Sequence, residues 1–173
     1  VEKVIKWACE GLDVDQALLQ RRFDQFLFDG ITTEAIQDNL IEHSKQLATA
    51  HTPDWVFVAG RLRTMNRWAT TGAYTVGFKK FVKTLMKDKY KHPAISLYSD
   101  KDLELLGSYI NQDNDLNHSF ASVVSAESKY LMNGECIQQM MMVNAMIIAG
   151  VEKPEKRVDT AIELYVKAFS PRK

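Results

Sequence analysis

The residues that could carry chemistry are few, and their spacing does not build a catalytic centre. Cys9 and Cys136 stand far apart, form no CxxC pair, and each lies among apolar residues. None of the four histidines has a glutamate three residues before it, the spacing used by di-iron helical bundles. The sequence also contains no P-loop and no GxGxxG. We therefore expect two buried thiols in a reducing, cytoplasmic setting, with no metal and no catalytic residue in this chain.

A second chemical candidate is the threonine pair in the stretch FDGITTEAI, residues 28–36. Thr32 has the position of a helix N-cap, whose hydroxyl accepts a hydrogen bond from an unpaired backbone N–H. Ile31 and Ile36 flank it with the spacing of a hydrophobic staple. Capping does not explain Thr33, which takes the first helical position. Its hydroxyl is therefore either solvated or available to a ligand.

A third candidate is the methionine cluster near residue 141, whose thioethers could bind a soft metal. These methionines recur at helical spacing among valine and isoleucine, which favours packing in a core. The same stretch, 137–150, is apolar nearly all round, so it should form the most buried helix and end at Gly150.

Charge and hydropathy exclude several kinds of partner. Lysine and arginine number 22, as do aspartate and glutamate, so the formal net charge is zero. Nucleic-acid binding needs clustered, uncompensated positive charge, and the lysine-rich stretch 79–92 reads instead as the outer face of an amphipathic helix. The apolar stretch 140–149 is too short to span a bilayer and contains Asn144. The first residues lack the apolar region of a signal peptide. We expect neither nucleic acid nor a membrane as partner.

The elements that would position these residues are helices, because apolar residues recur at helical spacing along the chain and no useful period-2 stretch occurs. The sequence therefore predicts an all-α protein. Ser99 and Asp102 resemble a capping box, and Thr52 followed by Pro53 resembles a helix start. Helices are expected over approximately 1–11, 15–30, 32–47, 52–72, 78–86, 99–110, 118–132, 137–150 and 154–170, with loops over 87–98 and 111–117.

Three stretches resemble, in order, the helical body of an ATP-cone, the regulatory nucleotide-binding domain of ribonucleotide reductase. They are WACEGL (7–12), FDGITTEAI (28–36) and PDWVFVAGRL (53–62). The stretches that follow resemble the helical N-terminal domain of class I large (alpha) subunits: GAYTVGFKKFV, DNDLNHSFASVVSAESKYLMN and GECIQQMMMVNAMIIAG. The closing AIELYVKAFSPRK is similar to the helix that leads into the catalytic barrel. Each motif is moderately specific, and the ordered set covers essentially the whole chain.

This resemblance implies two packed helical subdomains, an ATP-cone-like domain over 1–72 and the reductase N-terminal helical domain over 73–173. Thr33 matches the threonine of the family's D-G-I-x-T motif, which implies a contact with an ATP or dATP effector. The family's basic hairpin would precede the first residue of this chain. Gln37 and Ala69 stand where the family has a histidine and a lysine, which argues against effector binding by this chain alone.

The resemblance also implies a role. The chain would supply the allosteric and structural region of a ribonucleoside-diphosphate reductase large subunit, as a fragment or as one piece of a split subunit. The family's catalytic cysteines lie beyond this chain, so the barrel and the radical-generating small subunit would be partners. The stretch MMMVNAMIIA (140–149) and the final helix are candidates for the contact with the barrel, and a charge at Met141 or Ile148 would test that contact. Two alternatives stay open: a free-standing ATP-cone nucleotide-binding regulator, and a helical interaction module without catalysis.

Overall fold

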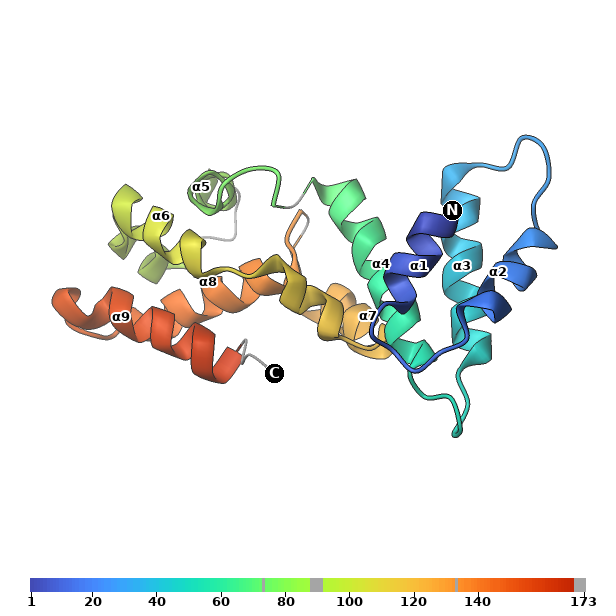
Figure 1. The fold of residues 1–173 in the computed structure, drawn as a ribbon. Helices are drawn as coiled ribbons and strands as arrows, with labels where there is room; N and C mark the ends of the chain where they lie inside the picture. Colours follow the sequence, from blue (N-terminus) through green and yellow to red (C-terminus); the bar gives the residue numbers. More distant parts are fainter. Residues whose placement is uncertain (73, 88–91, 133, 170–173) are drawn as a thin grey trace. The chain divides into compact units, whose positions relative to one another are not determined.

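The computed structural model describes residues 1–72, 74–87, 92–132 and 134–169, and within them the chain is all-α, as predicted (Figure 1). The α-helices are α1 (Glu2–Cys9), α2 (Gln16–Asp24), α3 (Thr33–Leu47), α4 (Trp55–Thr71), α5 (Phe78–Lys87), α6 (Asp100–Tyr109), α7 (Phe120–Lys129), α8 (Ile137–Ala149) and α9 (Pro154–Leu164). Two short 3₁₀ helices, η1 (Pro93–Leu97) and η2 (Gln112–Asn117), and a π-helical turn, η3 (Tyr165–Phe169), complete them.

The chain divides into two compact units. Val1–Thr70 and Asp115–Lys129 form the first unit, and the second contains Thr71–Asn114 and the chain from Tyr130 onward. The first unit is thus built from two separate stretches, and α7 belongs to it. The sequence-based boundary at residue 72 does not anticipate this return of the chain. As a division into homologous domains, it stays a prediction.

The core of the first unit lies among α1, α2, α3 and α4. Its fully or nearly fully buried side chains are Ile5, Ala8, Cys9, Leu19, Phe23, Leu40, Ile41, Trp55, Val58 and Leu62. On α4, Gly60 faces the stretch that enters α7: a Cβ built on it would lie 2.2 Å from the carbonyl oxygen of His118. Glycine therefore allows the two backbones to approach closely.

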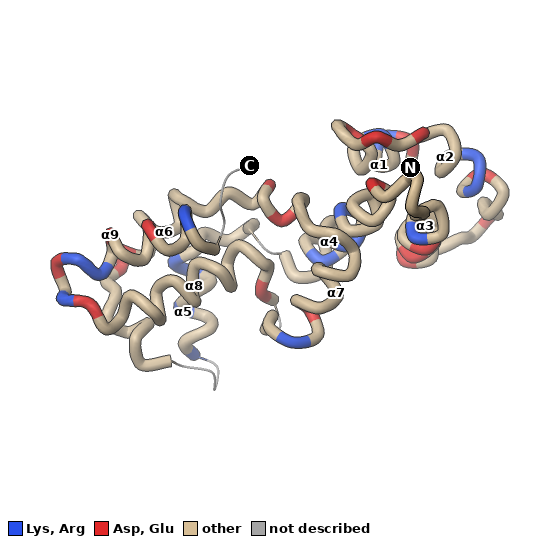
Figure 2. The backbone as a smooth tube through the Cα atoms, turned by 90° about the horizontal axis from the view of Figure 1, so that it is seen from below, with Lys and Arg blue, Asp and Glu red and all other residues tan. Residues whose placement is uncertain are grey.

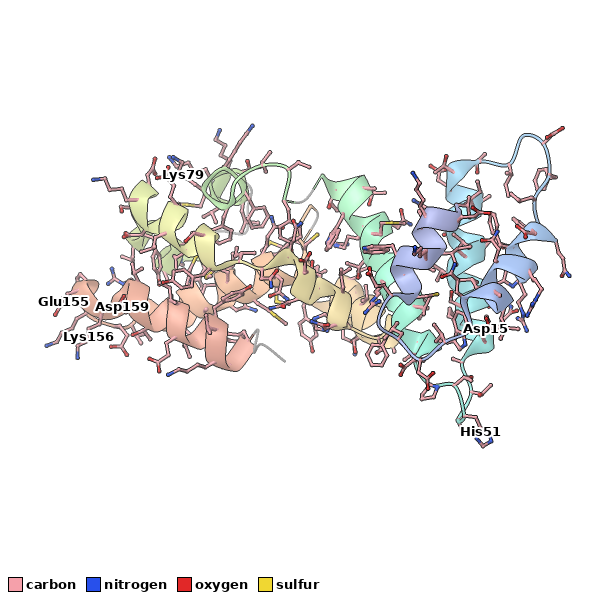
Figure 3. All side chains as sticks on the ribbon, in the orientation of Figure 1. Asp15, His51, Lys79, Glu155, Lys156 and Asp159 are labelled. Atoms are coloured by element: carbon pink, nitrogen blue, oxygen red, sulfur yellow. The ribbon has the colours of Figure 1, made fainter. Side chains whose placement is uncertain are left out.

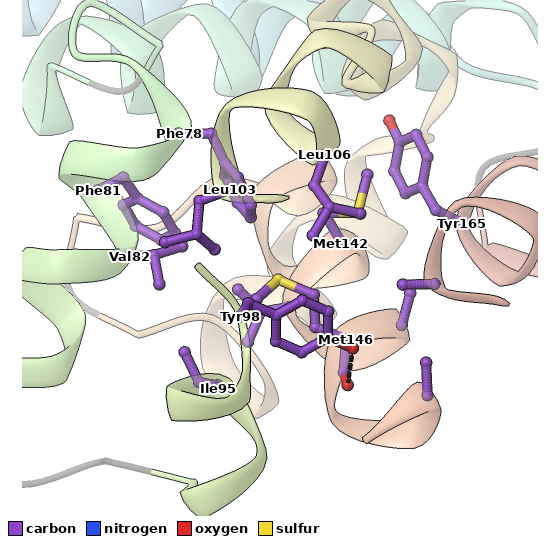
Figure 4. Close-up of a cluster of buried hydrophobic side chains, with 14 of the residues drawn as sticks. Phe78, Phe81, Val82, Ile95, Tyr98, Leu103, Leu106, Met142, Met146 and Tyr165 are labelled. Carbon is purple, nitrogen blue, oxygen red and sulfur yellow. Dashed lines mark hydrogen bonds between the residues drawn. The ribbon is translucent and has the colours of Figure 1, made fainter. Parts of the chain in front are cut away.

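The core of the second unit is formed by α5, α6, α8 and α9 with η1 (Figure 4). Its buried side chains are Phe78, Phe81, Val82, Leu85, Ile95, Tyr98, Leu103, Leu106, Met142, Val143, Ala145, Met146, Ala149, Ala161 and Tyr165. As predicted, α8 is heavily buried, with eight buried residues along its length, and Gly150 is its C-cap. The predicted capping box at the start of α6 is confirmed: the Asp102 carboxylate accepts from the Ser99 N–H at 2.7 Å, and the Ser99 hydroxyl accepts from the Asp102 N–H at 3.3 Å.

Several predicted helix limits are wrong. The second helix ends at Asp24 rather than at Gly30, because the Phe26 N–H bonds the Phe23 carbonyl in a tighter turn, and the following apolar residues are exposed. The Thr52 hydroxyl donates to the Leu47 carbonyl at 2.9 Å instead of capping α4. Two predicted loops contain the 3₁₀ helices η1 and η2, while the part of the first loop at 88–91 lies outside the described residues.

Acidic and basic residues are interleaved within each unit (Figure 2). On α5, Lys83 pairs with Asp100 of α6 at 2.7 Å and Lys79 pairs with Glu104, so part of the lysine-rich stretch is neutralised by its neighbour. Figure 3 shows His51 at the tip of the loop between α3 and α4, and Glu155, Lys156 and Asp159 projecting from α9. None of the described helices is both long enough and apolar enough to cross a membrane.

Candidate functional site

The candidate effector site begins at the N-terminus of α3. The Thr32 hydroxyl accepts a hydrogen bond from the Ala35 N–H at 3.1 Å, which confirms Thr32 as the N-cap. Thr33 follows at the first helical position and is exposed. No residue in the described part of the chain hydrogen-bonds its hydroxyl. The two neighbouring threonines therefore differ: the Thr32 hydroxyl caps α3, and Thr33 is exposed to solvent.

Three positions that bear on effector binding, Glu34, Gln37 and Ala69, carry no positive charge. Glu34, next to Thr33 in the first turn of α3, is exposed and would repel a phosphate. Gln37 lies one turn further on and is half-buried. Ala69 lies in the last turn of α4 and is exposed, so it offers a phosphate neither a charge nor a donor. What remains for an anion at this helix end is the partial positive charge of the unpaired backbone N–H groups.

A pocket of about 450 Å³ also lies in the first unit, along α1 and the start of α2. Lys3, Lys6, Trp7 and Glu10 line it, so it carries two ammonium groups and one carboxylate, and Cys9 and Val14 contribute apolar surface. Two ammonium groups beside an indole ring can hold a ligand that is both anionic and aromatic. Sequence reasoning missed this pocket, although the spacing of Lys3, Lys6 and Trp7 on one face of α1 was a visible sign.

The two cysteines occupy buried positions, as predicted. Cys9 is 7% exposed and Cys136 is 1% exposed, and both are free thiols. Burial raises the pKa of Cys9 to about 11, and the nearby Arg61 guanidinium lowers it only in part. The Arg61 group instead donates to the Ala8 and Glu10 carbonyls, at 3.1 Å and 2.6 Å, and so satisfies the end of α1. Cys9 therefore stays a neutral thiol rather than a nucleophile at ordinary pH.

Several charged residues of the first unit join α4 to the stretch 115–129 through ion pairs and hydrogen bonds. Glu127 of α7 is 12% exposed at its side chain and accepts from Arg63 of α4 through two nitrogens, each at 2.9 Å. Arg67 lies one turn further along α4, at 3.8 Å from the other carboxylate oxygen. The Trp68 indole N–H donates to the buried Asp115 carboxylate at 3.0 Å. In the part of the chain that the structure describes, no group of three or more metal-ligating side chains could hold an ion.

Comparison with known proteins identifies relatives across almost the whole chain. No protein-family model matches it. The ribonucleoside-diphosphate reductase subunit alpha of Synechocystis sp. is 33% identical over 169 residues, which cover 95% of this chain and 22% of that protein. The ribonucleoside-diphosphate reductase subunit alpha of Buchnera aphidicola subsp. Acyrthosiphon pisum is 31% identical over 159 residues, which cover 86% of this chain and 21% of that protein. Reductase 1 subunit alpha of Escherichia coli is 26% identical over 177 residues (98% and 23%).

The chain therefore spans about a fifth of the length of the curated relatives that it matches. The matched stretches include the three ATP-cone-like motifs and the three motifs of the following helical region, since the alignments cover nearly all residues here. This chain belongs to the family of ribonucleoside-diphosphate reductase alpha subunits and corresponds to their N-terminal portion.

Proposed function

We propose that this chain is the regulatory and structural N-terminal part of a class I ribonucleotide reductase large subunit, either as a fragment or as one piece of a split subunit. The observation that carries the proposal is the match over 95% of this chain to 22% of a relative named as a reductase alpha subunit. The reduction of ribonucleoside diphosphates would then be performed by the remainder of the large subunit, in cis or in trans, with a radical-generating small subunit. Two buried cysteines that form no disulfide fit a cytoplasmic setting.

A reconstitution tests this role. The tagged chain is used to pull partners from the source cells, and the eluate is assayed for CDP reduction. Co-elution of a larger protein with reductase activity is the expected result. Elution of the chain alone, without activity, contradicts the proposal in this form. Nucleotide binding without a larger partner would favour the free-standing ATP-cone regulator.

Within this role, the first unit acts as an ATP-cone and Thr33 contacts ATP or dATP. The support is the match of Thr33 to the D-G-I-x-T motif, its exposed hydroxyl, and its place among the unpaired N–H groups at the start of α3. Because Gln37 and Ala69 supply no cation, binding by this chain alone should be weak.

Paired substitutions at the two threonines separate effector binding from helix capping. Thr33→Ala removes a hydroxyl that bonds no described residue, so it should leave the free energy of unfolding nearly unchanged but weaken ATP binding roughly tenfold. Thr32→Ala removes the cap and should cost about 1 kcal/mol of stability. Calorimetric titration with ATP and dATP at low salt, and urea unfolding, give the two readouts.

Equal ATP affinity in the wild-type chain and in Thr33→Ala would remove Thr33 from the effector site. Gln37→His provides a gain-of-function arm, because it restores the imidazole of the family pattern, which can carry a positive charge toward a phosphate, and should strengthen binding. If neither nucleotide binds the wild-type chain or Gln37→His, the first unit is not an effector site, whatever the outcome of the reconstitution.

A further inference from the structure

A second-unit cavity of about 410 Å³ lies between the N-terminal side of α5 and the segment that links α6 to η2. Its apolar wall is formed by Val76, Phe78 and Ile110; Phe78, only 8% exposed, belongs to the core cluster (Figure 4). Gly107 of α6 belongs to the same lining, and a Cβ there would lie 2.8 Å from the Cβ of Phe78. One side of the cavity is therefore apolar: Phe78 is packed in the core there, whereas Val76 is exposed.

One polar group in this cavity is almost completely buried. Gln139 of α8 is 2% exposed, and it lines the cavity. Its Oε1 accepts the Cys136 N–H at 3.0 Å as part of the cap of α8, and this bond fixes which end of the carboxamide carries the nitrogen. No described residue accepts a hydrogen bond from Nε2. The polar atom that Gln139 leaves for the cavity is thus an N–H donor that bonds no described residue and that solvent or a ligand can reach.

The other polar groups of the cavity define what the ligand can be. Asp113 contributes a carboxylate and Gln112 a carboxamide, both on exposed residues of η2, and Tyr74 and Asn111 add a phenol group and a second carboxamide. Among the residues that the structure describes, no lysine, arginine or histidine lines the cavity. An anion such as a phosphate or a carboxylate would therefore meet a negative group and no compensating cation. A flat apolar wall, one fixed donor and acceptors nearby suit a neutral cyclic amide.

We propose that this cavity binds a small, uncharged cyclic amide, whose carbonyl oxygen accepts from Gln139 Nε2 and whose ring lies against the Phe78 wall. The ligand's N–H groups find acceptors at the η2 side of the cavity. This site is separate from the effector role of Thr33, which lies in the other unit, and the proposal stands whether or not the chain takes part in ribonucleotide reduction.

Pyridone is a suitable probe, and ¹⁵N–¹H NMR of the 173-residue chain is the direct measurement. Titration should shift the side-chain amide signals of Gln139, and benzoate, an anion of similar size, should leave them unchanged. Gln139→Glu keeps the oxygen that caps α8 and replaces the donor with an acceptor, so it should weaken pyridone binding at least about tenfold. Gln25→Glu, at the exposed C-cap of α2, makes the same chemical change in the other unit, at a residue that does not line the cavity, and should bind as the wild type does.

Three results would overturn the proposal: no shift at Gln139 up to the solubility limit of pyridone, equal affinity of Gln139→Glu and the wild type, or equal shifts with benzoate. The titration of the wild-type chain requires no substitution, so it decides the matter even if Gln139→Glu does not fold. A second variant, Asp113→Leu, should weaken pyridone binding by a smaller factor, because it removes an acceptor on an exposed residue.

Discussion

Two buried side chains, Tyr98 and Cys9, are held in their neutral forms. The Tyr98 hydroxyl is in the second-unit core and donates to the Met146 carbonyl at 2.7 Å (Figure 4). Burial raises the pKa of Tyr98 to about 12, with a small opposing effect from Arg157. Burial likewise raises the pKa of Cys9 to about 11. In both cases the cause is the cost of placing an anion in an apolar environment.

These two groups make stability fall at alkaline pH. Above pH about 9 for Cys9 and about 10 for Tyr98, the unfolded chain loses the proton while the folded chain keeps it up to about 11 and 12. The unfolded state then binds fewer protons, so the free energy of unfolding decreases as pH rises through this window and is unaffected below it. Each group contributes on the order of 2 kcal/mol to the decrease.

Urea unfolding of the wild type and of Tyr98→Phe at pH 8, 10 and 11.5 measures this. Tyr98→Phe should lower stability by about 1 kcal/mol at pH 8, because the Met146 carbonyl loses its donor, and should show a shallower alkaline decline. Parallel pH curves for the two proteins would show that Tyr98 is not responsible for any of the slope.

Sequence reasoning at single residues succeeded for two predicted helix caps and failed for the third, because the Thr52 hydroxyl bonds the Leu47 carbonyl instead. The Thr32 cap and the Ser99–Asp102 capping box use atoms within three residues, so their spacing alone predicts them. Gln139 shows the limit. Its side-chain oxygen also makes a local cap. Its side-chain nitrogen can bind a ligand only because residues of α5, α6 and η2 line a cavity with it, and no sequence pattern predicts that arrangement.

At the scale of elements, helix starts were predicted better than helix ends. The apolar residues Phe26, Leu27 and Phe28 continue a helical pattern, yet α2 ends before them and they are exposed. A pattern identifies a face that could be buried, and tertiary packing decides whether it is. The 3₁₀ helices η1 and η2 were missed because their hydrogen bonds span three residues and leave no apolar period.

The packing of α4 with the chain entering α7 depends on a single glycine. Gly60→Ala would place a methyl group 2.2 Å from the His118 carbonyl oxygen, so the backbones must separate. We expect a loss of about 2 kcal/mol or more, as for other overpacked sites, measured by thermal and urea unfolding. Gly77→Ala is the control, because a Cβ at this position meets nothing within 4 Å. This substitution should lower the free energy of unfolding by less than about 1 kcal/mol. Similar losses for the two variants would contradict a close approach at Gly60.

At the scale of the whole molecule, the all-α class and the family were predictable, because both follow from patterns along the sequence. The composition of the first unit was not predictable. Its second stretch, 115–129, follows α5, η1 and α6 in the sequence, although these three elements belong to the second unit. No break in composition marks the start of this stretch. Two contacts between residues far apart in the sequence hold α7 in the first unit: the Arg63–Glu127 ion pair and the close approach of the backbone at Gly60.

The proposed assembly with the remainder of the large subunit makes a prediction about Ile148. This residue lies on the otherwise buried α8 and is 51% exposed, whereas neighbouring Met141 is half-buried. Ile148→Asp should leave the melting temperature within a few degrees of the wild type, because an exposed position tolerates charge. It should weaken association with the remainder at least about tenfold, because a buried charge is costly at an interface.

Titration of the tagged variant with the remainder of the subunit measures this affinity. Val124→Asp, on α7 and 38% exposed, makes the same type of change in the other unit and should associate normally. Unchanged association of Ile148→Asp would remove α8 from the assembly surface.

The first unit is built from two separate stretches of the chain, and this has a consequence for its biosynthesis. A ribosome releases the chain from its N-terminus, so α1 to α4 emerge well before α7. Until α7 follows, Gly60 and Arg63 lack the surface against which they pack. The earliest time at which the first unit can be complete is therefore set by the translation of Lys129, not of Thr70. A shortened gene that ends after the codon for Gly72 would produce a nascent unit that never receives its last helix.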